Sequence, residues 1–125
     1  MECRIVTPTG VNPENHEIEI AIILMKYFKK DVEFLRPIDG FKIKTPDAVI
    51  DGVLWEFKSP IGNSKKSTIQ AQFRGLKQSR NIVIDSRRTK LDDEIIIQRI
   101  KQEMTEHRKV GNVLLITKSS VVIEF

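Results

Sequence analysis

The 125-residue chain has few of the residues that several common classes of protein require. Its single cysteine, Cys3, excludes an intramolecular disulfide and a cysteine-rich zinc site. The longest purely apolar run, Ile20–Met25, is too short to cross a bilayer, and residues 1–10 lack the apolar core of a secretory signal. With 40% hydrophobic and 30% charged residues, the chain is expected to form one soluble α/β domain over 1–125, of which 1–11 are expected to be a loosely ordered N-terminal segment.

The charge of the chain is unevenly distributed. The formal net charge is only +4, but residues 58–90 carry nine basic side chains and one acidic side chain. A basic segment between acidic flanks is typical of a protein that binds a phosphate backbone, and a solvated helix face is the alternative. The side chains expected to contact phosphates are Lys65, Lys66, Arg74, Lys77, Arg80, Arg87 and Arg88.

Hydrophobic periodicity predicts alternating helices and strands. Asn12-Pro13 has the pattern of an N-cap followed by a proline at the first helical position, and it begins a helix expected to end at Phe28 or Lys30. This helix is apolar nearly all round, so we expect it to be largely buried. Further helices are expected at 67–79 and from Asp92 or Asp93 to about 107. Strands are expected at 32–35, in a hairpin over 46–58, at 81–85 (parallel to a neighbour), at 113–117 and at 121–125. The order α-β-β-β-α-β-α-β-β indicates a mixed central sheet flanked by helices.

The hairpin has the strongest turn signal in the chain. Asp51-Gly52 favours a two-residue turn because both central residues must adopt a positive φ. In such a turn, the numbers of paired residues sum to 103, which places Asp47 opposite Glu56 at the open end of the hairpin. Lys58 lies two residues after Glu56 and points the same way. Both faces are apolar near the turn, so we expect the hairpin to lie in the interior.

Two opposed carboxylates are the feature with chemical consequences. Cross-strand neighbours have Cβ atoms about 4.5–5.5 Å apart, and two carboxylates at that separation in a half-buried sheet repel each other. A divalent cation bound by Asp47 and Glu56 removes the conflict, with Mg²⁺ first and Mn²⁺ or Zn²⁺ as alternatives. Lys58 would then hold or deprotonate the attacking water, or stabilise the charge of a phosphorane. The structural alternative is that Asp47 ends a strand and Glu56 pairs with Lys58.

The spacing of these residues resembles a known nuclease motif. Pro46-Asp47, eight residues and then Glu56-Phe57-Lys58 is similar to the motif of the PD-(D/E)xK superfamily. The superfamily core, which is restriction-endonuclease-like, consists of a helix, three strands, a helix and a further strand. The expected elements from residue 13 to residue 85 follow the same order.

A narrower resemblance covers most of the chain. The segments 12–15, 55–60 and 72–85 are similar to the C-terminal tRNase toxin domains of contact-dependent growth inhibition (CdiA-type) effectors. The resemblance implies metal-dependent cleavage of a phosphodiester, in tRNA above all, in the cytoplasm of a competing bacterium, with a small immunity protein as inhibitor. Charge complementarity predicts that this partner presents an acidic surface to the 58–90 segment or plugs the metal cleft.

The resemblance also suggests two supporting residues. It implies an additional acidic ligand on the first helix, for which Glu17 fits best, with Glu14 and Glu19 as alternatives. It implies that Gln72 on the second helix lies near the metal water. A helix N-terminus that favours negative charge would account for Glu14 equally well, and a solvated helix position would account for Gln72.

Three functions remain in competition at this point. The leading interpretation is a metal-dependent nuclease toxin domain with Asp47, Glu56 and Lys58 at its centre. A DNA endonuclease of the restriction or resolvase type would use the same site. A nucleic-acid-binding module without activity would retain the fold alone. His16 and His107 have no second ligand at metal spacing, so surface positions are expected for both.

Overall fold

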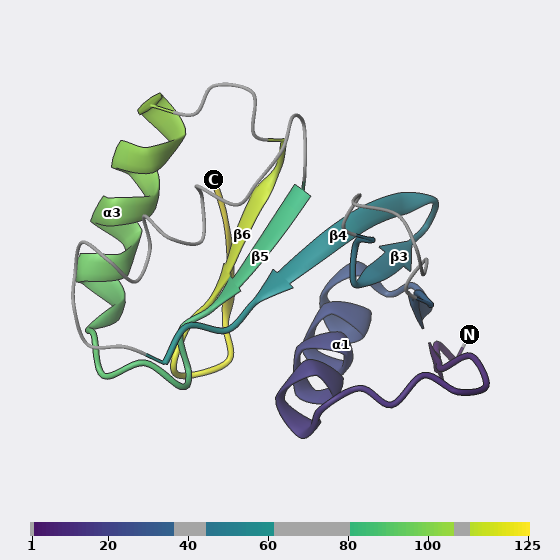
Figure 1. Ribbon diagram of the computed structural model, residues 1–125. Helices are drawn as coiled ribbons and strands as arrows, with labels where there is room; N and C mark the ends of the chain where they lie inside the picture. The colour runs from purple at the N-terminus through teal and green to yellow at the C-terminus, as the bar shows by residue number, and fades with distance from the viewer. Residues whose placement is uncertain (1, 37–44, 62–80, 107–110) are drawn as a thin grey trace. The chain divides into compact units, whose positions relative to one another are not determined.

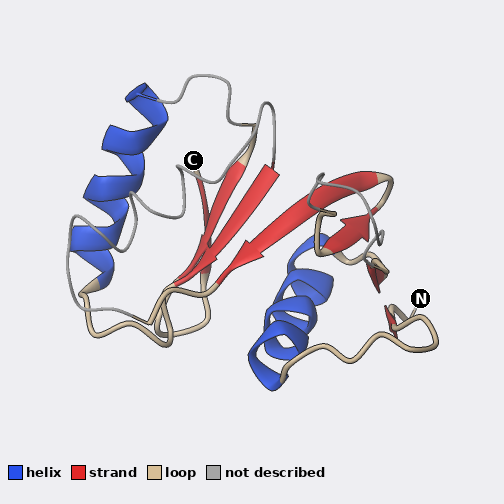
Figure 2. Ribbon diagram, in the orientation of Figure 1, coloured by secondary structure: helices blue, strands red, loops and turns tan. Residues whose placement is uncertain are grey.

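The computed structural model describes residues 2–36, 45–61, 81–106 and 111–125, which form seven strands and two helices (Figure 1). The chain divides into two compact units, residues 1–57 and 58–125. Each unit contains a helix and strands of a β-sheet (Figure 2). The arrangement agrees with the expected mixture of helices and strands, and the expected helix 67–79 lies outside the described residues.

The first unit contains one helix and four strands in the order β1-β2-β3-β4. Strand β1 is parallel to β2, and the two pairs that follow are antiparallel. The elements are β1 (Ile5–Val6), α1 (Asn15–Phe28), β2 (Val32–Phe34), β3 (Ala48–Ile50) and β4 (Val53–Lys58). Strand β4 crosses the division between the units, because Lys58 is its last residue and also the first residue of the second unit.

Strand β1 lies in the segment that was expected to be loosely ordered. Its two residues, Ile5 and Val6, pair in parallel with β2. The backbone N–H of Val32 donates to the carbonyl of Arg4 at 3.1 Å, and the N–H of Arg4 donates to Oδ1 of Asp31 at 2.8 Å. A strand of two residues is too short to show an alternating pattern, so periodicity could not predict it.

Helix α1 begins later than Asn12-Pro13 suggested. Its N-cap is Glu14, and a capping box joins Glu14 to Glu17: each side chain accepts a hydrogen bond from the backbone N–H of the other. The reciprocal bonds explain the later start, because they give hydrogen-bond acceptors to the backbone N–H groups of Glu14 and Glu17 at the first turn of the helix. The helix ends at Phe28 as expected, where Lys29 adopts a left-handed conformation and donates to the carbonyl of Met25 at 2.8 Å.

Helix α1, which was expected to be largely buried, is buried on one stripe only. Ile20, Ala21 and Leu24 are fully buried, whereas Ile22 is 36% exposed and Tyr27 is 38% exposed. The helix therefore buries one stripe, while Ile22 on the opposite side and Tyr27 in the last turn are partly exposed to solvent.

The β3–β4 hairpin forms with the expected turn and register. Asp51 and Gly52 have φ values of 50° and 79°, as a type I′ turn requires. The pairs Ala48–Trp55, Val49–Leu54 and Ile50–Val53 confirm the predicted alignment. The turn itself is the element that fixes which residues lie at the open end.

The hairpin is exposed at its turn, so the interior position expected for it is wrong there. Val53 is 40% exposed and Leu54, on the other face, is 49% exposed, whereas Trp55, Glu56 and Phe57 are buried. On the face of Trp55 and Phe57, aromatic rings hold β4 to its neighbours: Trp55 lies 5.8 Å from the ring of Phe28, and Phe57 lies 6.2 Å from that of Phe34. The apolar run of the hairpin misled the prediction because it does not distinguish a buried tip from an exposed one.

The second unit packs its helix on a three-stranded arrangement with the order β5-β6-β7. Strand β5 is parallel to β6, as expected for 81–85, and β6 is antiparallel to β7. The elements are β5 (Asn81–Asp85), α3 (Asp93–Glu106), β6 (Val113–Ile116) and β7 (Val122–Glu124). Asp92 precedes the helix as predicted, and its carbonyl accepts the N–H of Ile96 at 3.1 Å.

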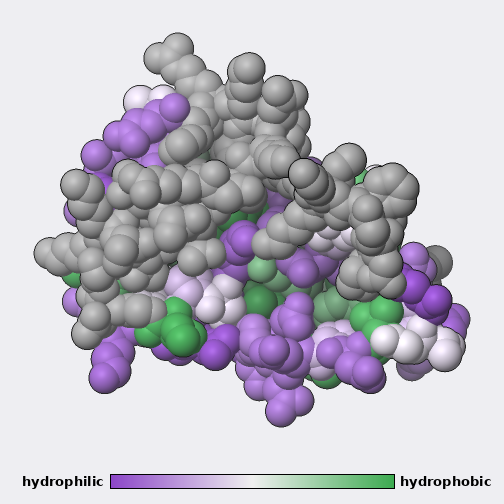
Figure 3. Space-filling view, viewed as in Figure 1, coloured by the Kyte–Doolittle hydropathy of each residue, from purple (hydrophilic) through white to green (hydrophobic). Residues whose placement is uncertain are grey.

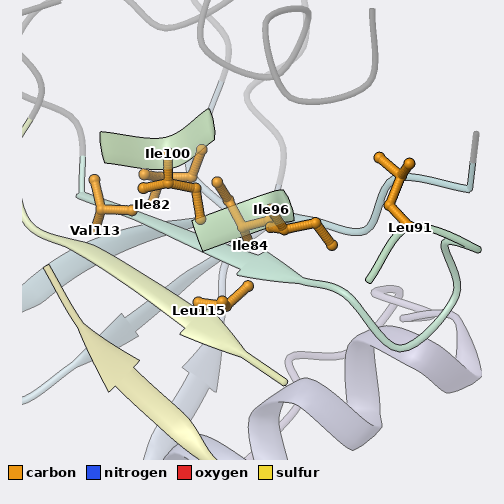
Figure 4. Packing of buried hydrophobic residues seen from close by; sticks show 7 residues of the cluster. All are labelled: Ile82, Ile84, Leu91, Ile96, Ile100, Val113 and Leu115. Atoms are coloured by element: carbon orange, nitrogen blue, oxygen red, sulfur yellow. The ribbon is translucent and has the colours of Figure 1, made fainter. Parts of the chain in front are cut away.

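The core of the second unit is aliphatic. Side chains that share a register position on β5 and β6 pack together with one stripe of α3 and with the loop before that helix (Figure 4). Each such side chain stabilises the fold by about 1.5–3 kcal/mol when it is fully buried. The cluster consists of Ile82, Ile84, Leu91, Ile96, Ile100, Val113 and Leu115.

The described surface is mainly polar on the face in Figure 3, where apolar residues appear as separate small patches. Neither helix of the described residues has the length and apolar character that a bilayer-spanning helix needs.

The turn provides a direct test of the register. Substitution Gly52→Val places a β-branched side chain at a φ of 79°, and we expect it to lower the free energy of unfolding by about 1–2 kcal/mol. Substitution Asp51→Asn is the control, because asparagine tolerates the left-handed conformation and should change stability by less than about 0.5 kcal/mol. Urea unfolding measures both. Equal effects of the two variants would contradict the turn assignment.

Candidate active site

Asp47 is fixed by three hydrogen bonds at the open end of the hairpin. Its carbonyl accepts the N–H of Leu35, which follows β2, at 3.0 Å. Its own N–H donates to the carbonyl of Trp55 at 3.0 Å, and its Oδ2 accepts the N–H of Phe57 at 2.7 Å. The side chain of Asp47 therefore has a structural role, and its bond to Phe57 restricts its orientation.

These bonds change the pairing that the sequence predicted. In a regular ladder Asp47 would pair with Glu56, with its N–H and C=O directed to the same neighbouring strand. Here the N–H bonds to β4 and the C=O to Leu35, a pattern typical of a β-bulge. Asp47 bonds to the two residues on either side of Glu56, so the two acids still lie at the same point along the hairpin.

Glu56 and Lys58 are consecutive on one side of β4, since side chains alternate along a strand. The side chain of Glu56 belongs to a residue that is only 3% exposed, and Lys58 is half-buried. Trp55 and Phe57, on the other side of the strand, anchor β4 through the aromatic contacts already described. A carboxylate buried to this extent requires a cation or hydrogen-bond donors to offset the loss of solvation.

Glu17 lies at the N-terminus of α1 with a defined structural partner. Its Oε1 accepts the N–H of Glu14 at 2.9 Å within the capping box. One ligand atom each from Glu14, His16 and Glu17 lie within 4.8 Å of one another, and His16 Nδ1 is 3.4 Å from Glu14 Oε2. His16 is half-buried and lies beside two acids, whereas the sequence predicted a surface position with no second ligand nearby. Glu19 is exposed.

Most of the basic residues expected to contact phosphates lie outside the described residues, as does Gln72. Two of the set are described. Arg88 is exposed, in keeping with a phosphate contact, whereas Arg87 directs its guanidinium at the buried carboxylate of Asp85. The residues outside the described ranges are Lys65, Lys66, Gln72, Arg74, Lys77 and Arg80.

Sequence reasoning missed a polar network where β5 and β6 end. Asp85 is fully buried and bonds to Arg87, while Lys118 donates to the carbonyls of Ser86 (3.0 Å) and Leu91. Ser86 Oγ donates to Asp93 at 2.6 Å. The sequence contains a signal for this network: Asp85 ends an apolar strand, and Arg87 follows two residues later. A carboxylate in such a place needs a nearby cation.

Two comparisons with known proteins bear on this geometry. A family model described as the contact-dependent growth inhibition CdiA C-terminal domain matches residues 44–122, which include Asp47, Glu56 and Lys58 but not α1. Among solved structures, a CdiA-CT/CdiI toxin and immunity complex from Burkholderia pseudomallei matches with a TM-score of 0.72 and 18% identity, over 99% of this chain and 98% of that chain. At this identity the likeness concerns the fold alone. No curated protein matches the sequence.

The anchoring of Asp47 predicts different stabilities for two substitutions. Asp47→Ala removes the acceptor of the Phe57 N–H, and we expect it to cost about 1–3 kcal/mol of unfolding free energy. Asp47→Asn retains a carbonyl oxygen at the same place and should cost less than half of that amount. Urea unfolding of the two variants, compared with the wild type, measures the difference. Equal stability of both variants would show that the bond to Phe57 contributes nothing.

Proposed function

Because this chain belongs to the contact-dependent growth inhibition CdiA C-terminal domain family, whose model matches more than half of it, we propose that it is a metal-dependent nuclease that hydrolyses phosphodiester bonds in tRNA. Membership of this family implies that the chain is a growth-inhibiting toxin of interbacterial competition. The chemistry, the substrate and the action in the cytoplasm of the target bacterium are what we propose in addition. The PD-(D/E)xK pattern of Asp47, Glu56 and Lys58 gives the proposal its reaction class.

The observation that carries the proposal is the bracketing of Glu56 by Asp47. Asp47 bonds to the residues before and after Glu56, which is itself 3% exposed. Hard oxygen donors in this number and type suit Mg²⁺, with Mn²⁺ or Zn²⁺ as alternatives, so the residues present fit a divalent cation. When bound by these carboxylates, such a cation supplies Lewis acidity at a phosphodiester.

The chain's own residues would divide the remaining work. Asp47 and Glu56 hold the cation, and the three hydrogen bonds of Asp47 keep it in a fixed position. Lys58 orients the attacking water and stabilises negative charge that develops at the phosphate. Glu17 is proposed as a supporting ligand from α1 and Gln72 as a polar neighbour of the attacking water. For Glu17 this duty would come in addition to its bond with Glu14.

The substrate follows from the charge of the 58–90 segment. Its nine basic side chains suit a polyphosphate backbone, and tRNA is the substrate that the family resemblance favours. Within the described residues, Arg88 is the exposed member of the predicted phosphate-binding set. A DNA duplex is the competing substrate. It has a similar phosphate charge and differs from tRNA in geometry.

The partner that we propose is a small acidic immunity protein that blocks the nuclease. The solved structure with the same fold is a toxin and immunity complex, and an acidic surface would complement the basic segment of this chain. Such a protein would compete with tRNA for the same charges.

The nuclease proposal is tested by incubating the protein with total tRNA and with plasmid DNA, in Mg²⁺ and in EDTA. We expect cleavage of tRNA in Mg²⁺ only. The variants Asp47→Asn, Glu56→Gln and Lys58→Met should each lose at least about 100-fold in rate. The exposed Glu33→Gln on β2 is the matched control and should retain full activity.

The other outcomes of this experiment have defined meanings. Cleavage of plasmid but not tRNA would replace the proposed substrate with DNA. Salt-sensitive binding of tRNA with no products in Mg²⁺, Mn²⁺ or Zn²⁺ would leave a binding module and overturn the enzyme. Full activity of any of the three site variants would remove that residue from the proposed chemistry.

The partner proposal predicts an effect of charge reversal. Arg88→Glu should weaken binding of the immunity protein from the same bacterium, chiefly through slower association, by about tenfold at low salt. Lys26→Glu makes the same change of charge at an exposed position of α1 in the other unit and should have little effect. Association rates measured by surface plasmon resonance at two salt concentrations decide the matter. Equal losses in both variants would indicate a dependence on net charge instead of a defined surface.

A further inference from the structure

Asp85 and Arg87 form an ion pair with several hydrogen bonds at the end of β5. The carboxylate of Asp85, which is fully buried, accepts the Nε of Arg87 at 2.8 Å and its Nη2 at 2.9 Å, each on a different oxygen. The backbone N–H of Arg87 adds a third bond at 3.0 Å. A planar guanidinium that matches a carboxylate in this way is held with a defined geometry.

Such a pair has a cost as well as a benefit. Removing two charges from water costs on the order of several kcal/mol for each ion. The attraction between the ions offsets this cost only when the hydrogen bonds of the pair are complete. In other proteins, apolar residues often replace a buried ion pair with little loss of stability. The pair is therefore better explained by what it holds in place than by its contribution to stability.

The residue that the pair holds is Ser59. Its Oγ donates to Oδ2 of Asp85 at 3.4 Å, a long bond that crosses 26 positions of the chain. Ser59 follows Lys58 directly and precedes Pro60, which is buried and has no N–H to donate. The hydroxyl of Ser59 thus connects the residue that follows β4 to the last residue of β5 within the second unit.

From these contacts we infer that the Asp85–Arg87 pair positions Lys58 for catalysis, with Ser59 as the connecting residue, and that Arg87 does not bind phosphate. The inference rests on the proposed nuclease function for its catalytic consequence. Ser59, Asp85 and Arg87 are positioning residues, because they act on the reaction only through Lys58. Two adjacent arginines therefore have different roles: Arg87 holds Asp85 within the second unit, and the exposed Arg88 contacts the nucleic acid.

The test uses Ser59→Ala, which removes one hydroxyl and leaves the ion pair intact. We expect its kcat on tRNA to fall about tenfold while KM and the salt dependence of tRNA binding stay unchanged. Ser59→Thr retains a hydroxyl and should restore kcat to near the wild-type value. Arg88→Ala should show the opposite split, with a higher KM and a salt slope reduced by about 1. Thr105→Ala, which removes a hydroxyl from an exposed helix position, is the matched control.

A second readout does not depend on activity. Amide hydrogen exchange at Lys58 and Ser59, followed by NMR, should be faster in Ser59→Ala than in the wild type and unchanged in Thr105→Ala. Unchanged exchange at both amides in Ser59→Ala would overturn the positioning role. Faster exchange with an unchanged kcat would overturn the catalytic consequence. If the wild type cleaves no nucleic acid, the proposed function fails, and the exchange data alone decide whether the pair holds this end of β4.

The phosphate assignment of Arg87 is tested separately by Arg87→Gln. This variant removes both the positive charge and the two-point fit to Asp85. We expect faster exchange at Lys58 and Ser59, a lower kcat and an unchanged salt slope. A salt slope reduced by about 1, with exchange unchanged, would make Arg87 a phosphate contact and overturn the inference.

Discussion

The hydrogen bond between the Phe57 N–H and the Asp47 carboxylate is the interaction on which the candidate site depends. It replaces a backbone acceptor that a regular ladder would supply at this point, so the side chain of Asp47 substitutes for main chain in the sheet. The same bond holds the carboxylate of Asp47 at the residue that follows buried Glu56. In the proposed function, a cation bound by both acids would offset the repulsion between them.

The sequence predicted the frame of this site but not its detail. Asp51-Gly52 determined the turn, and turn geometry determines register, so three of the expected pairs are present. The arithmetic assumed an uninterrupted ladder, however, and could not predict that Asp47 would turn its N–H toward Trp55. A bulge depends on which of several nearly equal hydrogen-bonding patterns the neighbouring strands favour, and one sequence does not reveal that balance.

Competition between alternative hydrogen-bonding partners also explains why the start of α1 and the role of Arg87 differ from the predictions. Asn12-Pro13 is a good helix start in isolation, but the reciprocal bonds of Glu14 and Glu17 satisfy more backbone groups. The basic segment was interpreted by counting charges, although a nearby buried carboxylate can take one arginine out of that count, as Asp85 does with Arg87. Counting finds the electrostatic character of a segment and misses the internal partner of each charge. Residues 62–80, which contain five of the segment's nine basic side chains, lie outside the described structure, so this part of the prediction stays a prediction.

The aromatic anchoring of β4 has a practical consequence. Trp55 is the only tryptophan of the chain, is 5% exposed and directly precedes Glu56. Its indole ring therefore supplies an intrinsic fluorophore one peptide bond away from a proposed cation ligand. Changes of its emission would follow events at this strand without any added label, and no other indole in the molecule would obscure the signal.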